Sequence, residues 1–310
     1  MDRTTVAASR PLPIPHVLYA EPLPDDLRAI VRDALPAGWG FEAVASRDRE
    51  ELLRRSAGAD FLIVASARVD DELLRASPRL RLVHHQGVGH DNVDLAACRR
   101  AGVPLAITPE GTTTGVAEHT ILLILALYKH LREVDAALRA GRWPVWEFRS
   151  RSYELSGKTL GLVGFGRVGR AVARRALAFE AVVVYYDPVP APPDVEEALG
   201  VRALPLDDLL GLADVVSLHL PLSPATRGVI GARELGLMRP HALLINTARG
   251  PLVDEHALED ALTARIIAGA GLDVFAQEPP SPDHPLFRLE NVVLTPHVAA
   301  GTRDAFKAKM

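Results

Sequence analysis

Three side chains suited to acid-base or carboxylate chemistry each stand a few residues beyond an apolar run that is typical of a buried strand. They are Arg249 in NTARG, Glu278 in DVFAQEP and His297 in NVVLTPH. Ligands of open α/β sheets bind outside the carboxyl ends of the strands. We therefore expect these three side chains to converge on one crevice.

The three residue types fit one class of reaction. The planar guanidinium of Arg249 can bind a carboxylate through two parallel hydrogen bonds and polarise the neighbouring carbonyl. The imidazole of His297, with an ordinary pKa of about 6.5, can give or take a hydroxyl proton near neutrality. The carboxylate of Glu278 would orient that ring and favour its charged form. Hydride transfer at C2 of a 2-hydroxy acid needs this set. It needs no metal, and no cluster of Cys, His and Asp stands at ligand spacing.

Structural interpretations of the same residues stay open. Arg249 can form an ion pair with Asp254 or Glu255, and Glu278 can face solvent. His219, in SLHLP, ends another apolar run and is a rival base. No acidic residue accompanies it in the same pattern, which favours a structural role.

A glycine-rich loop supplies the expected partner for this chemistry. The loop runs from Gly164 to Gly169 (GFGRVG), follows the apolar run TLGLVG and precedes a helical pattern. Gly164 permits a tight turn, Gly166 lets the backbone approach a pyrophosphate, and Gly169 lets the helix pack close to the strand. Asp187, at the end of the next strand, can accept hydrogen bonds from a ribose 2′-hydroxyl and would repel a 2′-phosphate. A dinucleotide site that prefers NAD is predicted; a purely structural βα turn is the alternative.

Apolar runs alternate with helical patterns almost throughout the chain, which predicts parallel sheets covered by helices on both faces. Strands are expected at 16–20, 41–45, 60–66, 80–86 and 104–108, and again at 159–164, 182–187, 214–220, 242–247, 268–273 and 291–295. Helices are expected near 24–34, 48–57, 70–76 and 94–101. One long helix, from about Val116 to Ala140 and ended by Gly141, is expected to join the two arrays.

The segment after that helix, GRWPVWEFRSRSYELSGK, has little periodicity and carries Trp143, Trp146 and Phe148. Two interpretations are open. It is an exposed arm that packs on a second subunit, or a loop that is held against its own domain.

The overall composition limits the classes of protein. The chain has 310 residues, 48% of them apolar, and its 35 basic and 39 acidic residues give a net charge of −4. It shows no basic field for nucleic acid or an anionic membrane. Cys98 is the only cysteine, so we expect a reducing, cytoplasmic environment. The N-terminus lacks the apolar stretch of a signal peptide, and the run from Ile121 to Tyr128 is far shorter than the ~20 residues that span a bilayer.

From about residue 60 to 302 the chain resembles the D-isomer-specific 2-hydroxyacid dehydrogenases, which use NAD. The resemblance rests on blocks in the same order: GVGHDNVDLAACRRAGVPLAITP, VAEHTILLILAL, GKTLGLVGFGRVG, YYDP, LHLPLSPATRGVI, LLINTARGPLVDEHAL, GAGLDVFAQEP and NVVLTPH. The first 60 residues match only in their βα pattern.

The resemblance implies roles for individual residues. Arg249 would bind and polarise the substrate, His297 would be the acid-base, and Glu278 would pair with it. The backbone N–H groups of Val88 and Gly89 would bind the substrate carboxylate. Beside the three loop glycines, cofactor contacts are implied for Arg167, Val168, Asp187, Thr247 and Asp273.

The resemblance also implies two doubly wound parallel-sheet α/β domains. Residues 1–110 would form a flavodoxin-like substrate-binding or lid domain, and 111–296 a Rossmann dinucleotide-binding domain. Residues 297–310 would return toward the lid. The tail GTRDAFKAKM is shorter than in the family, so we expect the last helix to be trimmed or absent.

The predicted function is D-specific oxidoreduction of a small 2-keto or 2-hydroxy acid with NAD, in a homodimer without nucleic-acid or membrane partners. A glyoxylate- or hydroxypyruvate-like substrate is favoured because 84–90 contains no Lys or Arg to bind a phosphate. The alternatives are 3-phosphoglycerate, phosphite or formate dehydrogenases of the same family. Glu278 argues against formate, since the resemblance implies a glutamine at this position in formate enzymes of the family. A further alternative is a NAD-sensing, corepressor-like protein without significant turnover, against which the lack of an extended Pro- or Ser-rich tail weighs.

Overall fold

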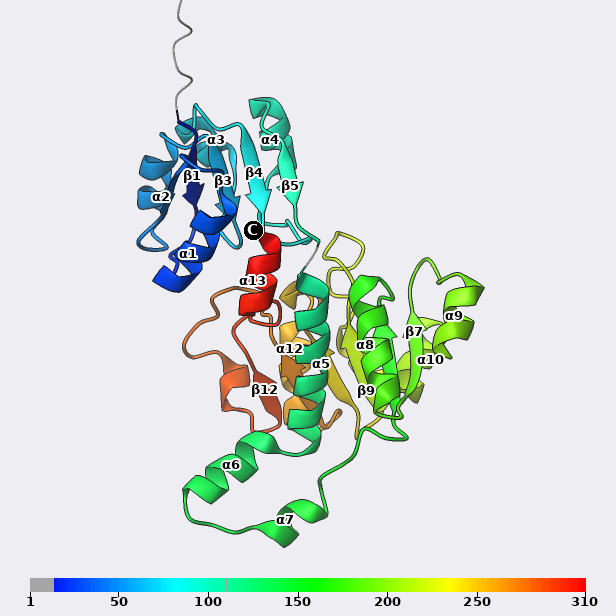
Figure 1. Ribbon diagram of the computed structural model, residues 1–310. Helices are drawn as coiled ribbons and strands as arrows, with labels where there is room; N and C mark the ends of the chain where they lie inside the picture. The colour runs from blue at the N-terminus through cyan, green and yellow to red at the C-terminus, as the bar shows by residue number, and fades with distance from the viewer. Residues whose placement is uncertain (1–13, 110) are drawn as a thin grey trace, which may run out of the picture. The chain divides into compact units, whose positions relative to one another are not determined.

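The chain folds into two compact units. In this computed structural model, which describes residues 14–109 and 111–310, one unit is Met1–Glu110 with Phe306–Met310 and the other is Gly111–Ala305. Each unit is built on its own parallel sheet (Figure 1). The predicted fold class, two doubly wound α/β domains, is confirmed.

The smaller unit has a flavodoxin-like sheet in the order β2-β1-β3-β4-β5, all parallel. Its strands are β1 (His16–Tyr19), β2 (Gly40–Ala43), β3 (Phe61–Val64), β4 (Leu82–His85) and β5 (Leu105–Ile107). Its helices are α1 (Asp25–Ala34), α2 (Arg49–Ser56), α3 (Asp71–Ala76) and α4 (Leu95–Ala101). Aspartate side chains cap the last three of these helices. The strand order reverses between β1 and β3, where sheets of this type bind ligands.

The last residues of the chain belong to the smaller unit. A helix, α13 (Arg303–Lys309), forms here, so the expectation that the last helix is absent is wrong. Phe306 and Met310 pack against the apolar cluster that contains Val17, Tyr19 and Val31. The aromatic rings of Phe306 and Tyr19 lie 6.2 Å apart. These apolar contacts are why the short segment is ordered as a helix.

The larger unit has a seven-stranded Rossmann sheet in the order β12-β11-β10-β9-β6-β7-β8, again all parallel. Its strands are β6 (Thr159–Val163), β7 (Val182–Tyr186), β8 (Arg202–Ala203), β9 (Val215–Leu218), β10 (Leu243–Asn246), β11 (Gly269–Leu272) and β12 (Val292–Leu294). The direction of strand addition changes between β6 and β9. Sheets of this type bind ligands at such a point, beyond the carboxyl ends of the strands. The two-residue strand β8 has no apolar run of its own and was not predicted.

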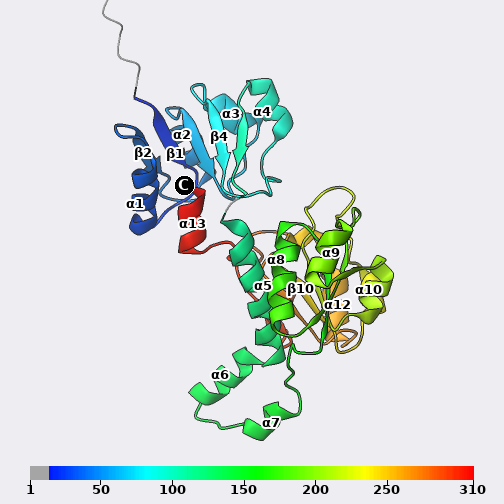
Figure 2. The same ribbon diagram turned by 45° about the vertical axis from the view of Figure 1, so that its right-hand side comes forward.

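Two apolar clusters cover this sheet, one on each face. On one face α5 (Thr112–Tyr128) and α8 (Arg167–Ala178) pack side by side (Figures 1 and 2). On the other lie α10 (Leu206–Leu212), α11 (Ala232–Leu237) and α12 (Glu255–Thr263). The short helix α9 (Pro193–Leu199) lies between β7 and β8. Strands buried on both faces explain the nearly continuous apolar runs in the sequence.

The predicted single helix from Val116 to Ala140 is wrong, because the chain breaks at His130. His130 has a φ of 48°, in the left-handed region, and separates α5 from α6 (Leu131–Arg139). Its ring nitrogens lie 3.0 Å from Glu133 Oε1 and 3.0 Å from the Arg151 carbonyl oxygen. These hydrogen bonds stabilise a backbone conformation that non-glycine residues rarely adopt.

An extension of the larger unit follows the break and contains α6 and α7 (Val145–Arg149), as Figures 1 and 2 show. Trp143 and Trp146 are 78% and 74% exposed, whereas Phe148 is buried. The segment is therefore anchored by Phe148 and presents both tryptophans to its surroundings.

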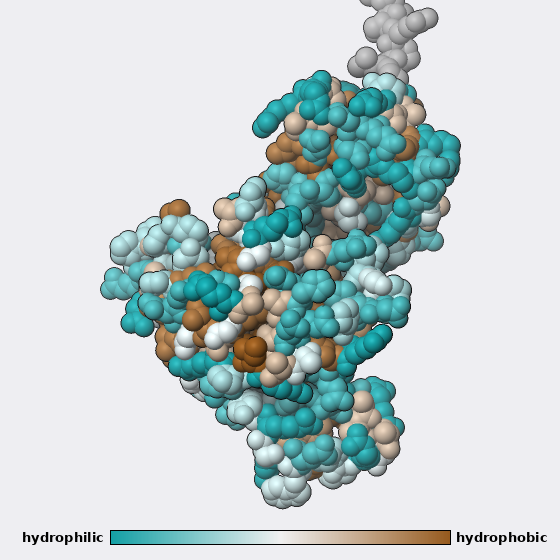
Figure 3. Space-filling view, turned by 180° about the vertical axis from the view of Figure 1, so that it is seen from behind, coloured by the Kyte–Doolittle hydropathy of each residue, from teal (hydrophilic) through white to brown (hydrophobic). Residues whose placement is uncertain are grey.

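No helix in the described residues is both long and apolar enough to cross a bilayer. One face of the molecule, seen in Figure 3, is largely hydrophilic, with apolar residues gathered mainly on the larger unit.

Candidate active site

A histidine–carboxylate pair lies beyond the carboxyl ends of β11 and β12. His297 Nδ1 donates a hydrogen bond of 2.6 Å to Glu278 Oε2, and both side chains are partly exposed, at 45% and 36%. The other Glu278 oxygen accepts the Phe275 N–H at 3.0 Å. The ring is thus oriented through Nδ1, and Nε2 is the ring nitrogen that this bond does not use.

Glu278 is held in its charged form. Burial alone would raise its pKa, but the hydrogen bond and charge of His297, the Phe275 N–H and the Arg249 guanidinium together outweigh this effect. The pKa of Glu278 therefore lies below its ordinary value. The carboxylate stays ionised near neutrality and stabilises a positive charge on His297.

A fully buried carboxylate shapes the backbone around His297. Asp273 Oδ1 accepts the Thr295 hydroxyl at 2.5 Å and the Val298 N–H at 2.9 Å, and Oδ2 accepts the Ala299 N–H at 2.8 Å. The Asp273 carbonyl oxygen also accepts the His297 N–H at 2.7 Å. His297 has a φ of 54°, a strained conformation for a residue with a side chain, and such strain concentrates at functional sites.

Sequence reasoning assigned Asp273 to cofactor contact and missed its hydrogen bonds around His297. It also missed His119 on α5, whose Nε2 donates to the Thr295 hydroxyl at 2.9 Å. The signal for Asp273 was present in the sequence, since the residue directly follows β11. Nothing in the sequence pairs residue 119 with residue 295.

Arg249 lies at the end of β10 and directly precedes a 3₁₀ turn, Gly250–Leu252. A Cβ atom on Gly250 would lie 1.9 Å from the Phe275 carbonyl carbon, so only glycine permits this contact between the β10 and β11 loops. The contact holds Arg249 beside the loop that carries Glu278, whose pKa its charge lowers. The larger unit thus brings Arg249, Glu278 and His297 to one edge of its sheet.

The glycine loop packs closely against the start of α8 and leaves open space at Gly166. A Cβ on Gly169 would lie 2.3 Å from the Gly164 oxygen, so α8 packs tightly under the turn, whereas a Cβ on Gly166 would meet no atom within 4 Å. No side chain caps the N-terminus of α8, where Gly166 and Arg167 are exposed and Val168 is partly buried. Backbone N–H groups of the first helical turn are therefore available to phosphates.

The side chains of Asp187 and Thr247 also make hydrogen bonds within the larger unit. Asp187 Oδ2 accepts the Phe165 N–H at 2.8 Å and Oδ1 accepts the Val189 N–H at 3.0 Å, so this carboxylate fixes the glycine loop. Each oxygen keeps a lone pair that a ribose hydroxyl can use. The buried Thr247 hydroxyl donates to Thr120 Oγ1 at 3.0 Å, because Thr120 itself donates to the Val116 carbonyl.

His219 is the rival base, and its surroundings favour a structural role. Burial lowers the pKa of His219 to about 3, so the ring is neutral near physiological pH. Its Nε2 lies 2.9 Å from the hydroxyl of the buried Ser217. A neutral imidazole held in this way lacks the second ring proton that a general acid would donate.

Val88 and Gly89 belong to the smaller unit, in the turn after β4. Val88 is 47% exposed and Gly89 is partly buried. Their predicted contact with the substrate carboxylate stays a prediction.

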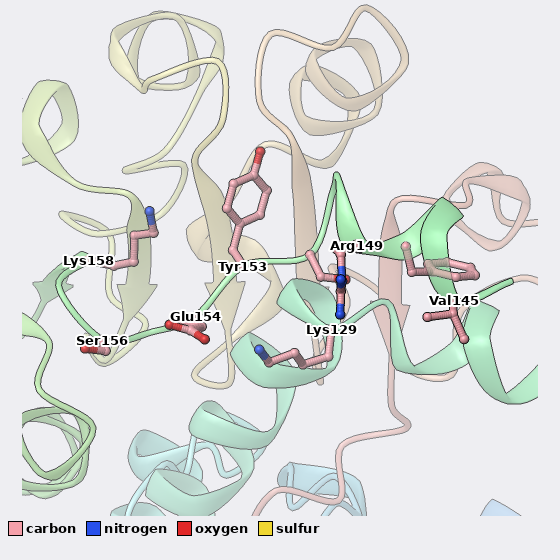
Figure 4. Close-up of a pocket in the computed structure, with 9 residues that line it drawn as sticks. Lys129, Val145, Arg149, Tyr153, Glu154, Ser156 and Lys158 are labelled. Atoms are coloured by element: carbon pink, nitrogen blue, oxygen red, sulfur yellow. The ribbon is translucent and has the colours of Figure 1, made fainter.

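A pocket of about 580 Å³ lies elsewhere in the larger unit, beside Lys158 at the start of β6 (Figure 4). Lys129, Arg149, Tyr153 and Glu154 also line it. It lies at the end of β6 opposite the glycine loop and contains none of the predicted site residues. In the described part of the chain, no group of three or more His, Cys, Asp or Glu side chains is placed to hold a metal ion.

Comparison with known proteins agrees with this geometry. Residues 121–299 match the family model for the NAD binding domain of D-isomer specific 2-hydroxyacid dehydrogenases. The chain is 43% identical over 293 residues to the D-3-phosphoglycerate dehydrogenase of Mycobacterium bovis, covering 94% of this chain and 54% of that protein. It is 41% identical over 269 residues to the glyoxylate reductase of Korarchaeum cryptofilum, covering 86% of this chain and 80% of that protein.

A solved protein structure from Thermus thermophilus superposes with a TM-score of 0.85 at 39% identity, covering 95% of this chain and 93% of that one. The chain therefore belongs to the D-isomer-specific 2-hydroxyacid dehydrogenase family, and its larger unit contains the family's NAD-binding domain. It spans about half the length of the Mycobacterium relative.

Two loop glycines should separate cofactor binding from folding. Gly166→Ala adds a methyl group in open space, so we expect nearly unchanged Tm but about tenfold or greater loss of NADH affinity, ~1.4 kcal/mol. Gly169→Ala places its Cβ against the Gly164 oxygen. The free energy of unfolding should therefore fall by about 1–3 kcal/mol, and Tm should fall with it. Thermal unfolding and NADH titration by fluorescence would measure both. Unchanged NADH affinity in Gly166→Ala would contradict the assignment of the loop.

His219 should make the protein less stable as pH falls. Its folded pKa of about 3 lies below the unfolded value of about 6.5, so between these values the unfolded chain binds the extra proton. Stability is then lost as pH falls below about 6.5, by up to about 1.4 kcal/mol per pH unit. His219→Gln cannot take up that proton, and its Tm should fall less between about pH 7 and about pH 5. Parallel Tm–pH curves for both proteins would refute this.

Proposed function

We propose that this protein catalyses the NAD-dependent interconversion of a small 2-keto acid and the D-2-hydroxy acid. The hydrogen bond between His297 and Glu278, at the same sheet edge as Arg249, is the observation that carries the proposal. An imidazole that keeps Nε2 outward and is backed by an ionised carboxylate can transfer a proton and bear the resulting charge.

Each residue has a distinct task in the reduction. Arg249 binds the carboxylate of the keto acid and polarises its C2 carbonyl. His297 protonates the developing alkoxide oxygen from Nε2, and Glu278 stabilises the imidazolium before that step. NADH, when bound, supplies the hydride to C2 and is oxidised to NAD⁺. The residues proposed to hold it are the glycine loop Gly164–Gly169, Asp187, Thr247 and Asp273.

NAD is proposed over NADP because Asp187 ends β7 with its carboxylate fixed beside the loop. A 2′-phosphate would meet that negative charge. The smaller unit, residues 1–110, is proposed as the substrate-binding domain, with Val88 and Gly89 as carboxylate ligands and 297–310 returning toward it. The cofactor domain is proposed to be 111–296. A cytoplasmic location is proposed from the single, unpaired Cys98.

A glyoxylate- or hydroxypyruvate-like substrate is favoured, since the segment 84–90 offers histidines and Gln86 but no Lys or Arg for a phosphate. The relatives are named both for 3-phosphoglycerate and for glyoxylate, so 3-phosphoglycerate is the main rival. Phosphite, formate and a corepressor-like role without turnover are the remaining alternatives. Glu278 in place of glutamine counts against formate.

The deciding experiment is NADH oxidation with glyoxylate, hydroxypyruvate, pyruvate, longer 2-keto acids and 3-phosphohydroxypyruvate, repeated with NADPH. We expect glyoxylate or hydroxypyruvate with NADH to give the highest kcat/KM. His297→Ala should lower kcat by a factor on the order of 10²–10⁴ with NADH affinity retained. A higher kcat/KM for 3-phosphohydroxypyruvate would overturn the substrate proposal. NADH binding without turnover of any keto acid would favour the sensor.

A homodimer through the extension is also proposed, because Trp143 and Trp146 expose large apolar surfaces on a segment anchored by the buried Phe148. Light scattering should give twice the chain mass of 33.5 kDa. The double variant Trp143→Ala/Trp146→Ala should give the mass of one chain. Val189→Ala, an exposed apolar residue outside the extension, is the control and should stay dimeric. A mass of one chain for the unmodified protein would contradict the proposed homodimer.

A further inference from the structure

The turn after β4 has an unusual feature: two successive backbone carbonyls each face an imidazole. The Gly87 carbonyl oxygen lies 3.3 Å from His85 Nδ1, and the Val88 carbonyl oxygen lies 2.9 Å from His90 Nδ1. A Cβ on Gly87 would lie only 3.7 Å from the His85 ring, so that ring packs directly against the turn. Carbonyls only accept hydrogen bonds, so both Nδ1 atoms act as donors when these bonds form.

These contacts fix the directions of two N–H groups. In a planar trans peptide the C=O and the N–H of the same unit point in opposite directions. The Gly87 carbonyl shares its peptide plane with the Val88 N–H, and the Val88 carbonyl shares its plane with the Gly89 N–H. Each imidazole therefore turns one N–H of the turn away from itself. In the described residues, the Val88 N–H has no hydrogen-bond partner.

His85 is itself held by a second residue. Asn92 Nδ2 donates to the Ala67 carbonyl oxygen at 2.7 Å, which leaves Asn92 Oδ1 as the acceptor for His85 Nε2 at 3.0 Å. Both ring nitrogens of His85 thus face acceptor oxygens, and only the doubly protonated ring donates to the two at once. His85 is 4% exposed, so this bond is shielded from water. The ring can neither tilt nor flip without losing a buried hydrogen bond.

The loop behind Asn92 is fixed in turn by Glu21, at the carboxyl end of β1. Glu21 Oε1 accepts three successive backbone N–H groups, those of Ala65, Ser66 and Ala67, at 3.0, 2.7 and 2.7 Å. The hydrogen bonds thus run from a buried carboxylate, through the β3 loop and Asn92, to His85 and the turn. They lie at the sheet edge where folds of this type bind ligands.

We propose that His85 and His90 are positioning residues for substrate binding: they hold the peptide planes of Gly87–Gly89 so that the Val88 and Gly89 N–H groups point at the substrate carboxylate. Asn92 fixes His85 in this task. The inference rests on the proposed function, in which this turn binds the carboxylate. It assigns the two histidines no contact with the reacting atoms.

The test measures KM for the preferred keto acid, KM for NADH and kcat in His90→Ala, a partly exposed position whose loss leaves the core intact. Loss of one oriented hydrogen bond to a charged group should raise the keto-acid KM by about tenfold or more. The NADH KM should stay unchanged, because the cofactor loop belongs to the other unit. His90→Asn places an amide N–H where Nδ1 stood and should restore most of the affinity.

His85→Ala and Asn92→Ala should each raise the keto-acid KM, and the double variant should be no worse than His85→Ala, since both act on one contact. His16→Ala is the matched control: this histidine lies at the opposite edge of the same sheet, paired with Glu42 at 3.2 Å. It should leave both KM values unchanged even if Tm falls.

The possible outcomes distinguish a failure of the positioning role from a failure of the proposed function. An active protein whose keto-acid KM stays within about twofold in His90→Ala would overturn the positioning role alone. A parallel rise in the NADH KM, or no rescue by His90→Asn, would also overturn it, because general damage to the fold would explain both. An unmodified protein without keto-acid turnover would overturn the proposed function first, and the positioning role with it.

Discussion

His297, the proposed acid-base residue, depends on a carboxylate that is fully buried. Asp273 accepts hydrogen bonds from Thr295, Val298 and Ala299 with its side chain and from His297 with its carbonyl. A buried charge is stable only when its oxygens are satisfied by donors, and here the donors are the backbone of the loop that must be shaped. The same hydrogen bonds therefore satisfy the Asp273 oxygens and hold His297 at its strained φ.

Parallel strands explain why separate segments serve one site. Every strand of the larger unit ends at the same edge, so the loops after β6, β7, β10, β11 and β12 supply the glycine loop, Asp187, Arg249, Glu278 and His297. These groups stand on loops that are anchored by a close-packed core, and contacts between neighbouring loops fix them further. Within this set, His297 and Glu278 orient each other through a hydrogen bond, and Asp187 fixes the glycine loop.

The residues proposed to carry out the reaction do not by themselves decide which 2-keto acid is the substrate. A carboxylate next to a carbonyl is common to all 2-keto acids, and the contacts proposed for Arg249 and for the Val88–Gly89 turn involve only that shared part. Relatives named for 3-phosphoglycerate and for glyoxylate match the chain at 43% and 41% identity, so the shared fold does not by itself fix the substrate. The absence of Lys and Arg from 84–90 is the sequence feature that bears on this choice.

The sequence by itself determined the two βα arrays with all their strands except β8, and the glycine loop, and it supplied the residues proposed to react. Buried parallel strands are apolar throughout, and a pyrophosphate turn admits few residues besides glycine, so both leave local patterns. Only the tertiary structure decided the break at His130, the two-residue β8, the place of Asp273 beneath His297, and the imidazoles behind the Gly87–Gly89 turn. The His130 ring bonds a carbonyl 21 residues away, and Asp273 bonds N–H groups 25 and 26 residues away. Such contacts depend on how loops meet in space, and the chain carries no periodic pattern that encodes them.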